Sequence, residues 1–316
     1  MAGVELVDLS AVRAAARRLR GRVVRTPLLP SPWPELWLKP ENLQPTGAFK
    51  LRGATYALAR LPAGRRAAGV VTHSSGNHGL ACAYAARDAG VPCTVVVPEA
   101  AAPHKVAAIR ELGAEVVAVP AGEREARARR IADERGATVV PPYDHRDVIA
   151  GQGTVGLEIV ADLPDVDTVL VPVGGGGLAS GVAVAVTALA PRAKVVGVEP
   201  ELAADARDSL AAGALRPWPA EQTYRTVADG LRTALSELTL AHLRAHLDRV
   251  VTVSEEEILD ATRRLLRDAR LVAEPSGAVA TAAFLHHRDE LPAGRTAAVI
   301  SGGNLDPALL RRLVDR

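Results

Sequence analysis

A lysine at the start of a predicted helix is the first residue whose position suggests chemistry. Residues 39–54 run from a short predicted strand, through a turn at Pro45 and Gly47, into a helix whose first turn carries Lys50. The positive end of the helix dipole and partial burial beside Phe49 would both favour the neutral amine. The neutral amine is the form that attacks a carbonyl carbon. Taken alone, the stretch is explained at least as well by a surface lysine that opens a helix.

A polar loop follows a second predicted strand and opens another helix. It contains Ser74, Ser75, Gly76, Asn77 and His78. Hydroxyls, an amide and free backbone N–H groups at a helix N-terminus suit an anionic group such as a carboxylate. Capping of the helix by one serine explains one hydroxyl but not the cluster, so both interpretations stay open. His78 has no carboxylate or cysteine beside it in the sequence, and packing is the expected role of its ring.

Four consecutive glycines separate a third strand from its helix: Gly174, Gly175, Gly176 and Gly177. Such a run costs backbone entropy, and close approach of the chain to a phosphate would explain it. No Lys-Ser or Lys-Thr pair follows, so the loop is not a Walker motif. It does fit G-x-G-x-x-A, with Glu199 at the end of the next strand, which leaves a dinucleotide site as a serious alternative.

A third loop, beginning with Ser301 and Gly302, follows the last predicted strand. A serine at a strand end beside glycines allows close approach to a flat ligand. A simple connecting turn explains this loop equally well.

The elements that position these loops alternate between apolar strands and helices. This alternation predicts an α/β fold of two lobes, each with a mostly parallel twisted sheet flanked by helices. A break near Pro141 and Pro142 divides the chain into a large domain, residues 1–68 with 144–316, and a small domain, residues 69–143. The predicted strands are Gly69–Thr72, Cys93–Val97, Glu115–Val119, Thr138–Val140, Thr168–Val173, Lys194–Val198, Arg249–Val253 and Thr296–Ile300, and the helices between them include Asn77–Ala89, Pro103–Leu112, Glu123–Arg135 and Leu178–Ala190.

Composition excludes several classes of protein. A net charge of +2 over 316 residues gives no nucleic-acid footprint, and 48% hydrophobic residues are ordinary for a globular protein. Cys82 and Cys93 lack metal-ligand spacing and are expected to be buried thiols in a reducing compartment.

The N-terminus is expected to form an amphipathic helix capped by Ser10 and closed by Gly21, and Ser254 is expected to open a later helix. No apolar run approaches membrane-spanning length, so the predicted location is the cytoplasm.

Taken together, the motifs resemble the fold-type II pyridoxal-phosphate family, in the branch of serine and threonine dehydratases and serine racemases. They occur in the family's order from about Arg25 to Asn304, and the lysine, asparagine and tetraglycine motifs are jointly specific. The resemblance favours pyridoxal phosphate over the dinucleotide. The matching pieces are residues 39–42 and 46–54, Ser74–Gly79, Ile149–Thr154, Gly174–Gly177, Ala228–Gly230, Glu274–Gly277 and Ser301–Asn304.

The resemblance implies a role for each loop. Lys50 would hold the cofactor as a Schiff base and later remove the α-proton. The substrate carboxylate would bind at Ser74, Ser75, Gly76, Asn77 and His78, and Ser75 would reprotonate Cα in a racemase. The other expected cofactor contacts are Phe49 beside the ring, Asn77 at the phenolic oxygen, Gly174, Gly175, Gly176, Gly177 and Leu178 at the phosphate, and Ser301 with Gly302 at the pyridine nitrogen.

The implied reaction is elimination of water from L-serine or L-threonine, giving a 2-oxo acid and ammonia. A hydroxyl at the pyridine nitrogen makes a weaker electron sink than a carboxylate would, which favours loss of the β-hydroxyl over transamination. The implied partners are a small amino-acid substrate and a second copy of the chain, with neither nucleic acid nor membrane. Glu199, the Ala203 carbonyl and Asp205 match the family's site for Mg²⁺ or Ca²⁺.

Alternatives remain for the substrate and for the class of protein. Ala48 replaces the family's usual serine, and Tyr143 replaces the asparagine of mammalian-type serine racemases, which favours the dehydratases. Serine racemase remains an alternative, as does a dehydratase for 3-hydroxyaspartate or a phenylserine-like substrate. Arg232 would be a second carboxylate partner for a diacid, although a surface role is simpler. From other classes, a NAD(P)-binding oxidoreductase and a catalytically silent binding protein remain.

Overall fold

The strands form two separate sheets. In the computed structural model, which describes residues 5–74 and 76–314, the first sheet contains β1 (Leu29–Pro30), β2 (Leu36–Pro40), β7 (Thr168–Pro172), β8 (Lys194–Pro200), β9 (Arg249–Val253) and β10 (Thr296–Ile300). The second contains β3 (Val70–His73), β4 (Cys93–Pro98), β5 (Glu115–Val119) and β6 (Thr138–Val139). The strand orders are β1-β2-β10-β7-β8-β9 and β5-β4-β3-β6. Every pairing is parallel except that of β1 with β2, which confirms the predicted fold class.

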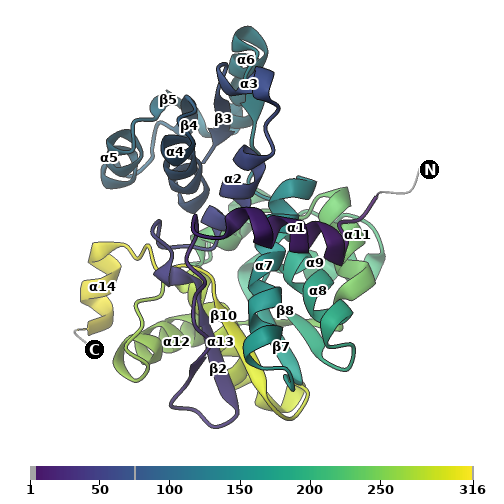
Figure 1. Ribbon diagram of the computed structural model, residues 1–316. Coiled ribbons are helices and arrows are strands. Elements are labelled where there is room, and N and C mark those ends of the chain that lie inside the picture. The colour runs from purple at the N-terminus through teal and green to yellow at the C-terminus, as the bar shows by residue number, and fades with distance from the viewer. Residues whose placement is uncertain (1–4, 75, 315–316) are drawn as a thin grey trace.

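Helices surround both sheets (Figure 1). The longer helices are α1 (Leu9–Leu19), α2 (Lys50–Ala59), α4 (Asn77–Ala89), α5 (Pro103–Glu111), α6 (Arg124–Arg135), α7 (Arg146–Asp162), α8 (Gly177–Leu189), α9 (Asp205–Ala212), α11 (Glu237–His246), α12 (Glu255–Arg267), α13 (Pro275–His286) and α14 (Pro307–Val314). Short turns of helix are α3 (Ala63–Arg66), α10 (Ala220–Thr223), η1 (Glu41–Leu43), η2 (Ala121–Glu123), η3 (Glu201–Ala203), η4 (Asp229–Leu231) and η5 (Arg288–Glu290).

Most element boundaries agree with the sequence analysis, and one predicted cap is wrong. Each predicted strand is present with its ends within two residues of the prediction. The first helix begins at Leu9, and Asp8, not Ser10, caps it by accepting the Ala11 N–H at 2.8 Å. The Ser10 hydroxyl donates to the same carboxylate oxygen at 2.8 Å, because a charged acceptor attracts both donors. The cap at Ser254 is confirmed.

The order of the strands brings the predicted loops to one edge of the large sheet. In that sheet β10 lies between β2 and β7, and all three run parallel. The carboxyl ends of neighbouring parallel strands meet at the same edge, which is where α/β proteins bind ligands. The loop that starts at Ser301 and the tetraglycine loop leave adjacent strands at this edge.

Helix α2 lies where the two halves of the molecule meet (Figure 1). It packs against α4, which follows a strand of the small sheet, and against α7, which precedes β7. Leu51 and Leu58 of α2 share a hydrophobic cluster with Val70 and Val95 of the small sheet. The proposed boundaries at residues 68/69 and 143/144 remain a prediction, and they would assign α2 to the large domain although its apolar face packs on the small one.

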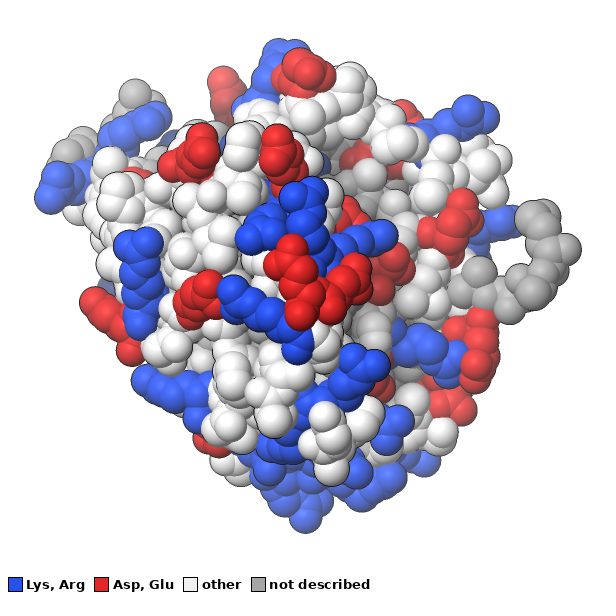
Figure 2. Space-filling model, turned by 90° about the horizontal axis from the view of Figure 1, so that it is seen from above, with Lys and Arg blue, Asp and Glu red and all other residues white. Residues whose placement is uncertain are grey.

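The surface agrees with the balanced composition. On the face seen from above, acidic and basic side chains are interspersed over the centre, and basic side chains gather along the lower edge (Figure 2). Within residues 5–74 and 76–314, no helix has the length and apolar character that crossing a bilayer requires.

Candidate active site

The segment before Lys50 is attached to the end of β10. Ala48 and Gly302 form an isolated antiparallel bridge, and the Phe49 N–H donates to the Ser301 carbonyl at 3.0 Å. The lysine motif and the last loop, far apart in the sequence, therefore lie side by side. This contact fixes where α2 begins and so where Lys50 stands.

Lys50 is the first residue of α2 and its side chain is half-buried. Its Nζ donates to the Pro142 carbonyl at 2.7 Å and lies 5.0 Å from the centroid of the Phe49 ring. Burial lowers the pKa of the amine to about 8. The predicted lowering is confirmed, and desolvation of the ammonium is its main cause. A substantial fraction of this amine is neutral near pH 8, which suits attack on an aldehyde.

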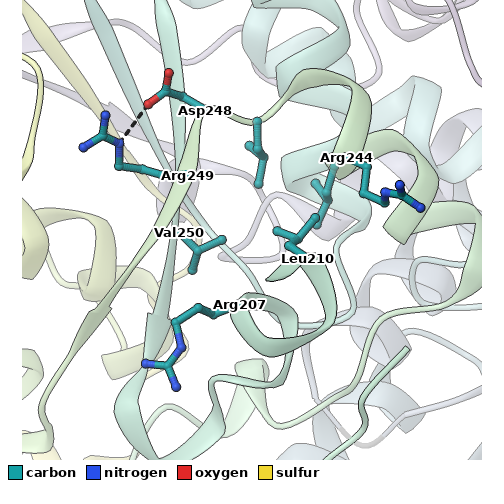
Figure 3. Close-up of a pocket in the computed structure, with 8 residues that line it drawn as sticks. Arg207, Leu210, Arg244, Asp248, Arg249 and Val250 are labelled. Atoms are coloured by element: carbon teal, nitrogen blue, oxygen red, sulfur yellow. Dashed lines mark hydrogen bonds and ion pairs between the residues drawn. The ribbon is translucent and has the colours of Figure 1, made fainter. Parts of the chain in front are cut away.

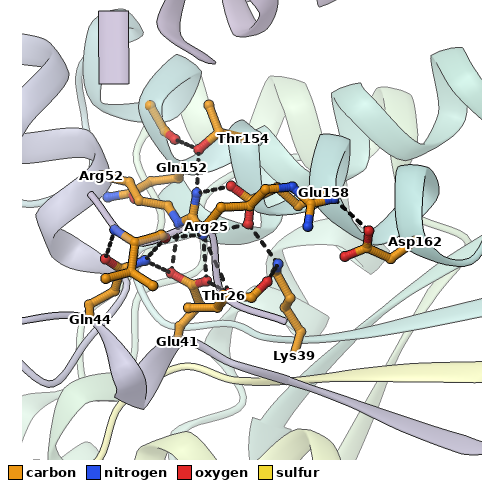
Figure 4. Close-up of polar contacts among 12 residues, drawn as sticks. Arg25, Thr26, Lys39, Glu41, Gln44, Arg52, Gln152, Thr154, Glu158 and Asp162 are labelled. Carbon is orange, nitrogen blue, oxygen red and sulfur yellow. Dashed lines mark hydrogen bonds and ion pairs between the residues drawn. The ribbon is translucent and has the colours of Figure 1, made fainter. Parts of the chain in front are cut away.

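A cluster of buried charges holds the other side of this segment (Figure 4). Arg52 donates two hydrogen bonds to Glu41 and two to Glu158, each at 2.7 Å. The Lys39 Nζ donates to Glu158 and to the Thr26 carbonyl, each at 2.6 Å. Two cations face two carboxylates, so the buried charges are balanced. The cluster ties β2, η1, α2 and α7 together two residues from Lys50.

A hydrogen-bonded chain of three side chains crosses between the two halves of the molecule. The Asn77 Nδ2 donates to Glu274 Oε1 at 2.6 Å, and the Asn304 Nδ2 donates to Asn77 Oδ1 at 2.7 Å. Both ends of the Asn77 amide are thus oriented, and one N–H of Nδ2 remains for another acceptor. Burial raises the pKa of Glu274 to about 7.

Ser75 of the serine loop lies outside the described residues, and the other residues of the loop are described. The Ser74 Oγ accepts the Gly76 N–H at 3.2 Å. His78 is buried, its Nε2 is 2.9 Å from the Val140 carbonyl oxygen, and burial lowers its pKa to about 3. The His78 ring is therefore neutral, but its polar contacts orient it: beside the Val140 carbonyl, Cys82 Sγ lies 3.5 Å from Nε2, so the expectation that no cysteine is near was wrong.

The tetraglycine loop joins β7 to the N-terminus of α8. Gly176 has a φ of +83°, a conformation that glycine adopts without strain. Within the described part of the chain, no acceptor takes the N–H groups of Gly174, Gly175, Gly176 or Gly177. Unpaired N–H groups at the start of a helix form an anion-binding site, and the helix dipole reinforces it.

Residues 19–302 match the protein family described as pyridoxal-phosphate dependent enzyme. The chain belongs to this family. It is 42% identical to an L-threonine ammonia-lyase of Thermotoga maritima, over 98% of this chain and 79% of the relative. It is 38% identical to an L-threo-3-hydroxyaspartate ammonia-lyase of Saccharomyces cerevisiae, over 92% and 91% of the two chains. The solved structure of maize serine racemase superimposes with a TM-score of 0.93 at 35% identity and covers 98% of both chains.

The cofactor of this pyridoxal-phosphate-dependent enzyme family is pyridoxal phosphate, and the residues present fit it. The tetraglycine loop offers unpaired N–H groups for a phosphate, and Lys50 offers an amine with a lowered pKa for an aldehyde. The dinucleotide alternative fits less well, because it gives no role to the Lys50 amine, which is half-buried against the Pro142 carbonyl.

The remaining predicted cofactor residues lie at the same edge of the sheet. Ser301 is buried, and its Oγ donates to the Ser276 carbonyl at 3.3 Å. Gly302 lies against Glu274, since a Cβ at Gly302 would come within 2.2 Å of Glu274 Oε1. Leu178 is buried in the first turn of α8. Pro142 and Tyr143 connect Lys50 with the tetraglycine loop, since Tyr143 contacts that loop.

The predicted metal ligands surround the start of α9. Glu199 and Asp205 are buried, and burial raises their pKa values to about 8 and about 6. Ala203 is buried in the turn between them. Among the described residues, no group of three or more His, Cys, Asp or Glu side chains is arranged to hold a metal ion. A cation here would therefore depend on a backbone carbonyl and water as well.

A cavity of about 280 Å³ lies away from these loops, between α9, α11 and β9. Its walls include Leu210 and Val250 together with Arg207, Arg244 and Arg249, whose guanidinium groups point in different directions (Figure 3). None of the motif residues that the structure describes lines this cavity.

Two groups of site residues escaped the sequence analysis. Glu274 and Arg52 lie within motifs that carry the resemblance, but the sequence predicts no role for either. One signal in the sequence pointed to Glu274: it stands directly before Pro275, which opens α13. Its side chain does not cap that helix and is therefore free to contact another element. No sequence signal linked Glu41 or Glu158 to Arg52.

Proposed function

We propose that this protein is a pyridoxal-phosphate-dependent ammonia-lyase that eliminates water from a β-hydroxy amino acid, L-serine or L-threonine, giving a 2-oxo acid and ammonia. The observation that carries the proposal is the Lys50 amine, with its lowered pKa, on a segment whose backbone is bridged to the loop of Ser301. The similarity to proteins named L-threonine ammonia-lyase supports it.

Each group would have a distinct task. Bound pyridoxal phosphate would draw electrons from Cα of the substrate. Lys50 would attach the cofactor and take the Cα proton, and the free N–H of Asn77 would hold the phenolic oxygen. Ser301 would meet the pyridine nitrogen with a neutral hydroxyl, which favours expulsion of a β-hydroxyl over transamination. The substrate carboxylate would bind to the loop that contains Ser74.

The test is an assay for 2-oxo acid with both enantiomers of serine, threonine and 3-hydroxyaspartate. We expect the L-serine or L-threonine reaction to dominate and the Lys50→Ala variant to lose at least about 10³-fold in kcat. Borohydride reduction and mass spectrometry should place the cofactor on Lys50. A protein that stays colourless with pyridoxal phosphate, or a label on another side chain, would refute the proposal.

Racemisation is a second candidate, favoured by the close superposition on maize serine racemase. It would need a proton donor on the side of Cα opposite Lys50, and we propose Ser75. The Ser75→Ala variant should lose racemisation and turnover of D-substrate while keeping elimination from L-serine. Equal loss of both activities would contradict this role.

A diacid substrate is the third possibility, and its proposed anchor is Arg232. One terminal nitrogen of Arg232 donates to the Thr226 carbonyl at 2.6 Å, and the guanidinium stacks on Tyr224 at 5.1 Å. Among the described residues only one of its five N–H donors has a partner, so donors remain for a carboxylate. This assignment would be supported if the native enzyme prefers 3-hydroxyaspartate and the Arg232→Met variant loses that preference.

A divalent cation, Mg²⁺ or Ca²⁺, is proposed between Glu199, the Ala203 carbonyl and Asp205. Two buried carboxyls with raised pKa values are the supporting observation, because a cation would stabilise their ionised forms. Each oxygen of Glu199 keeps a lone pair after accepting one N–H. A melting temperature that rises with Mg²⁺ and falls with a chelator is the expected result. If neither Mg²⁺ nor the chelator changes the melting temperature, the cation site is contradicted.

We further propose that the protein is a homodimer located in the cytoplasm. Light scattering and fractionation of the source cells would test these two points.

A further inference from the structure

The segment between the small sheet and α7 contacts both halves of the proposed cofactor site. The Pro142 carbonyl accepts the Lys50 amine at 2.7 Å. The next residue, Tyr143, lies against the tetraglycine loop. A Cβ at Gly175 would come within 2.4 to 2.5 Å of three ring carbons of Tyr143, and one at Gly177 within 2.8 Å of the Tyr143 Cβ.

This contact explains why position 175 requires glycine. Gly175 does not have a positive φ, so backbone strain does not demand glycine there. The Tyr143 ring leaves no room for a methyl group, and ring carbons held by their own backbone cannot move aside cheaply. The Tyr143 ring occupies the space that a side chain at position 175 would need.

We infer that Tyr143 is a positioning residue for the cofactor phosphate: its ring, packed on Gly175 and Gly177, holds the tetraglycine loop in its binding conformation. The inference rests on the proposed function of this site. Four glycines in a row have unusual conformational freedom, and a rigid ring against the loop reduces the entropy lost when a phosphate binds. Burial raises the pKa of the Tyr143 hydroxyl to about 12, so the side chain stays neutral.

Cofactor affinity in the absence of substrate tests this role. Pyridoxal phosphate and pyridoxal are titrated separately into protein from which the cofactor has been removed, in a buffer without phosphate. The visible absorbance reports binding. The Tyr143→Ala variant should bind pyridoxal phosphate about tenfold more weakly, while its affinity for pyridoxal changes less than about twofold. The Tyr143→Phe variant should match the native protein, because the ring makes the contact.

A double-mutant cycle separates the ring from other causes. Gly175→Ala should weaken pyridoxal phosphate binding by about 100-fold in the native background and by less than about threefold in the Tyr143→Ala background. Gly122→Ala is the matched control, since a Cβ there meets nothing within 4 Å. If Gly175→Ala does not fold but the double variant does, the steric cause is established directly. If neither variant folds, the affinities of Tyr143→Ala and Tyr143→Leu for pyridoxal phosphate and for pyridoxal decide whether the ring positions the phosphate loop.

Additive effects of the two substitutions would overturn the inference, as would equal weakening for pyridoxal and pyridoxal phosphate. Because no substrate is present, these outcomes are independent of which reaction the enzyme catalyses. A protein that binds pyridoxal phosphate as described here but produces no 2-oxo acid would refute the proposed activity and leave the role of Tyr143 intact.

Discussion

At the scale of single residues, Glu274 links the acid–base state of the site to its geometry. Its Oε1 accepts the Asn77 amide at 2.6 Å. Burial, with Asp229, raises the pKa of Glu274 to about 7, although the Asn77 hydrogen bond and Lys105 both lower it. An ionised Glu274 can only accept from Asn77, whereas a protonated one can also donate. The strength of the hydrogen bond that holds the Asn77 amide, which is proposed to bind the cofactor oxygen, therefore depends on pH.

The Glu274→Gln variant isolates this dependence. Glutamine keeps an oxygen that accepts from Asn77 but does not titrate. We expect kcat/KM of the native enzyme to rise with pH through an inflection near 7 and the inflection to be absent in the variant. A pH–rate profile from 5.5 to 9 makes the comparison. An inflection that persists in Glu274→Gln would assign it to another group.

The same substitution has an effect on stability whose sign follows from the raised pKa. Between its ordinary value of 4.5 and about 7, the folded state holds the Glu274 proton more tightly than the unfolded state does. The stabilisation is therefore complete below pH 4.5 and is lost as pH rises through about 7. Relative to Glu274→Gln, the unloaded native protein should lose unfolding free energy between pH 5 and pH 8, as measured in urea. A difference between the two proteins that does not change with pH would contradict this.

At the scale of elements, the cluster around Arg52 sets the position of α2. Its carboxylates come from η1 and α7, and removing the guanidinium would leave both without their main partner. We expect Arg52→Met to cost about 3–5 kcal/mol of unfolding free energy, because it leaves uncompensated buried charge. Arg52→Lys should recover part of this loss, since an ammonium cannot bridge two carboxylates in the same way.

Arg60, the residue directly after α2, provides the control. It pairs with Asp147 at 3.6 Å, and its side chain is 52% exposed. Arg60→Met should change the unfolding free energy by less than about 1 kcal/mol. Similar costs for Arg52→Met and Arg60→Met in urea unfolding would mean that the buried cluster does not hold α2.

The elements also show which parts of the site a sequence can predict. The loops of Lys50, Asn77 and Ser301 were predictable because each follows a strand and carries its own glycines and polar groups. The contact of Asn77 with Glu274 was not, because it depends on how two separate sheets approach each other. Spacing along the chain predicts an element and the face a residue occupies, but not its partner on a distant element. The contact of Tyr143 with Gly175 could not be predicted for the same reason.

At the scale of the whole molecule, an ion pair closes the contact between the two halves. Lys105 on α5 lies 3.3 Å from Asp229 in η4, and both perturb the pKa of Glu274. Their side chains are 28% and 48% exposed, so the pair contributes little to stability. Its position between the half that carries Asn77 and the half that carries Ser301 suits a role in closing the site over substrate.

Lys105→Met should therefore raise KM by about two- to fivefold while the unfolding free energy changes by less than about 1 kcal/mol. Salt screens exposed charges, so the KM difference between native enzyme and variant should shrink in 0.5 M salt, where the Debye length is only about 4 Å. Arg129→Met removes a surface pair with Glu125 on α6 and should leave KM unchanged. A KM difference that is insensitive to salt would show that Lys105 acts through packing and not through its charge, and the closing role of the ion pair would fail.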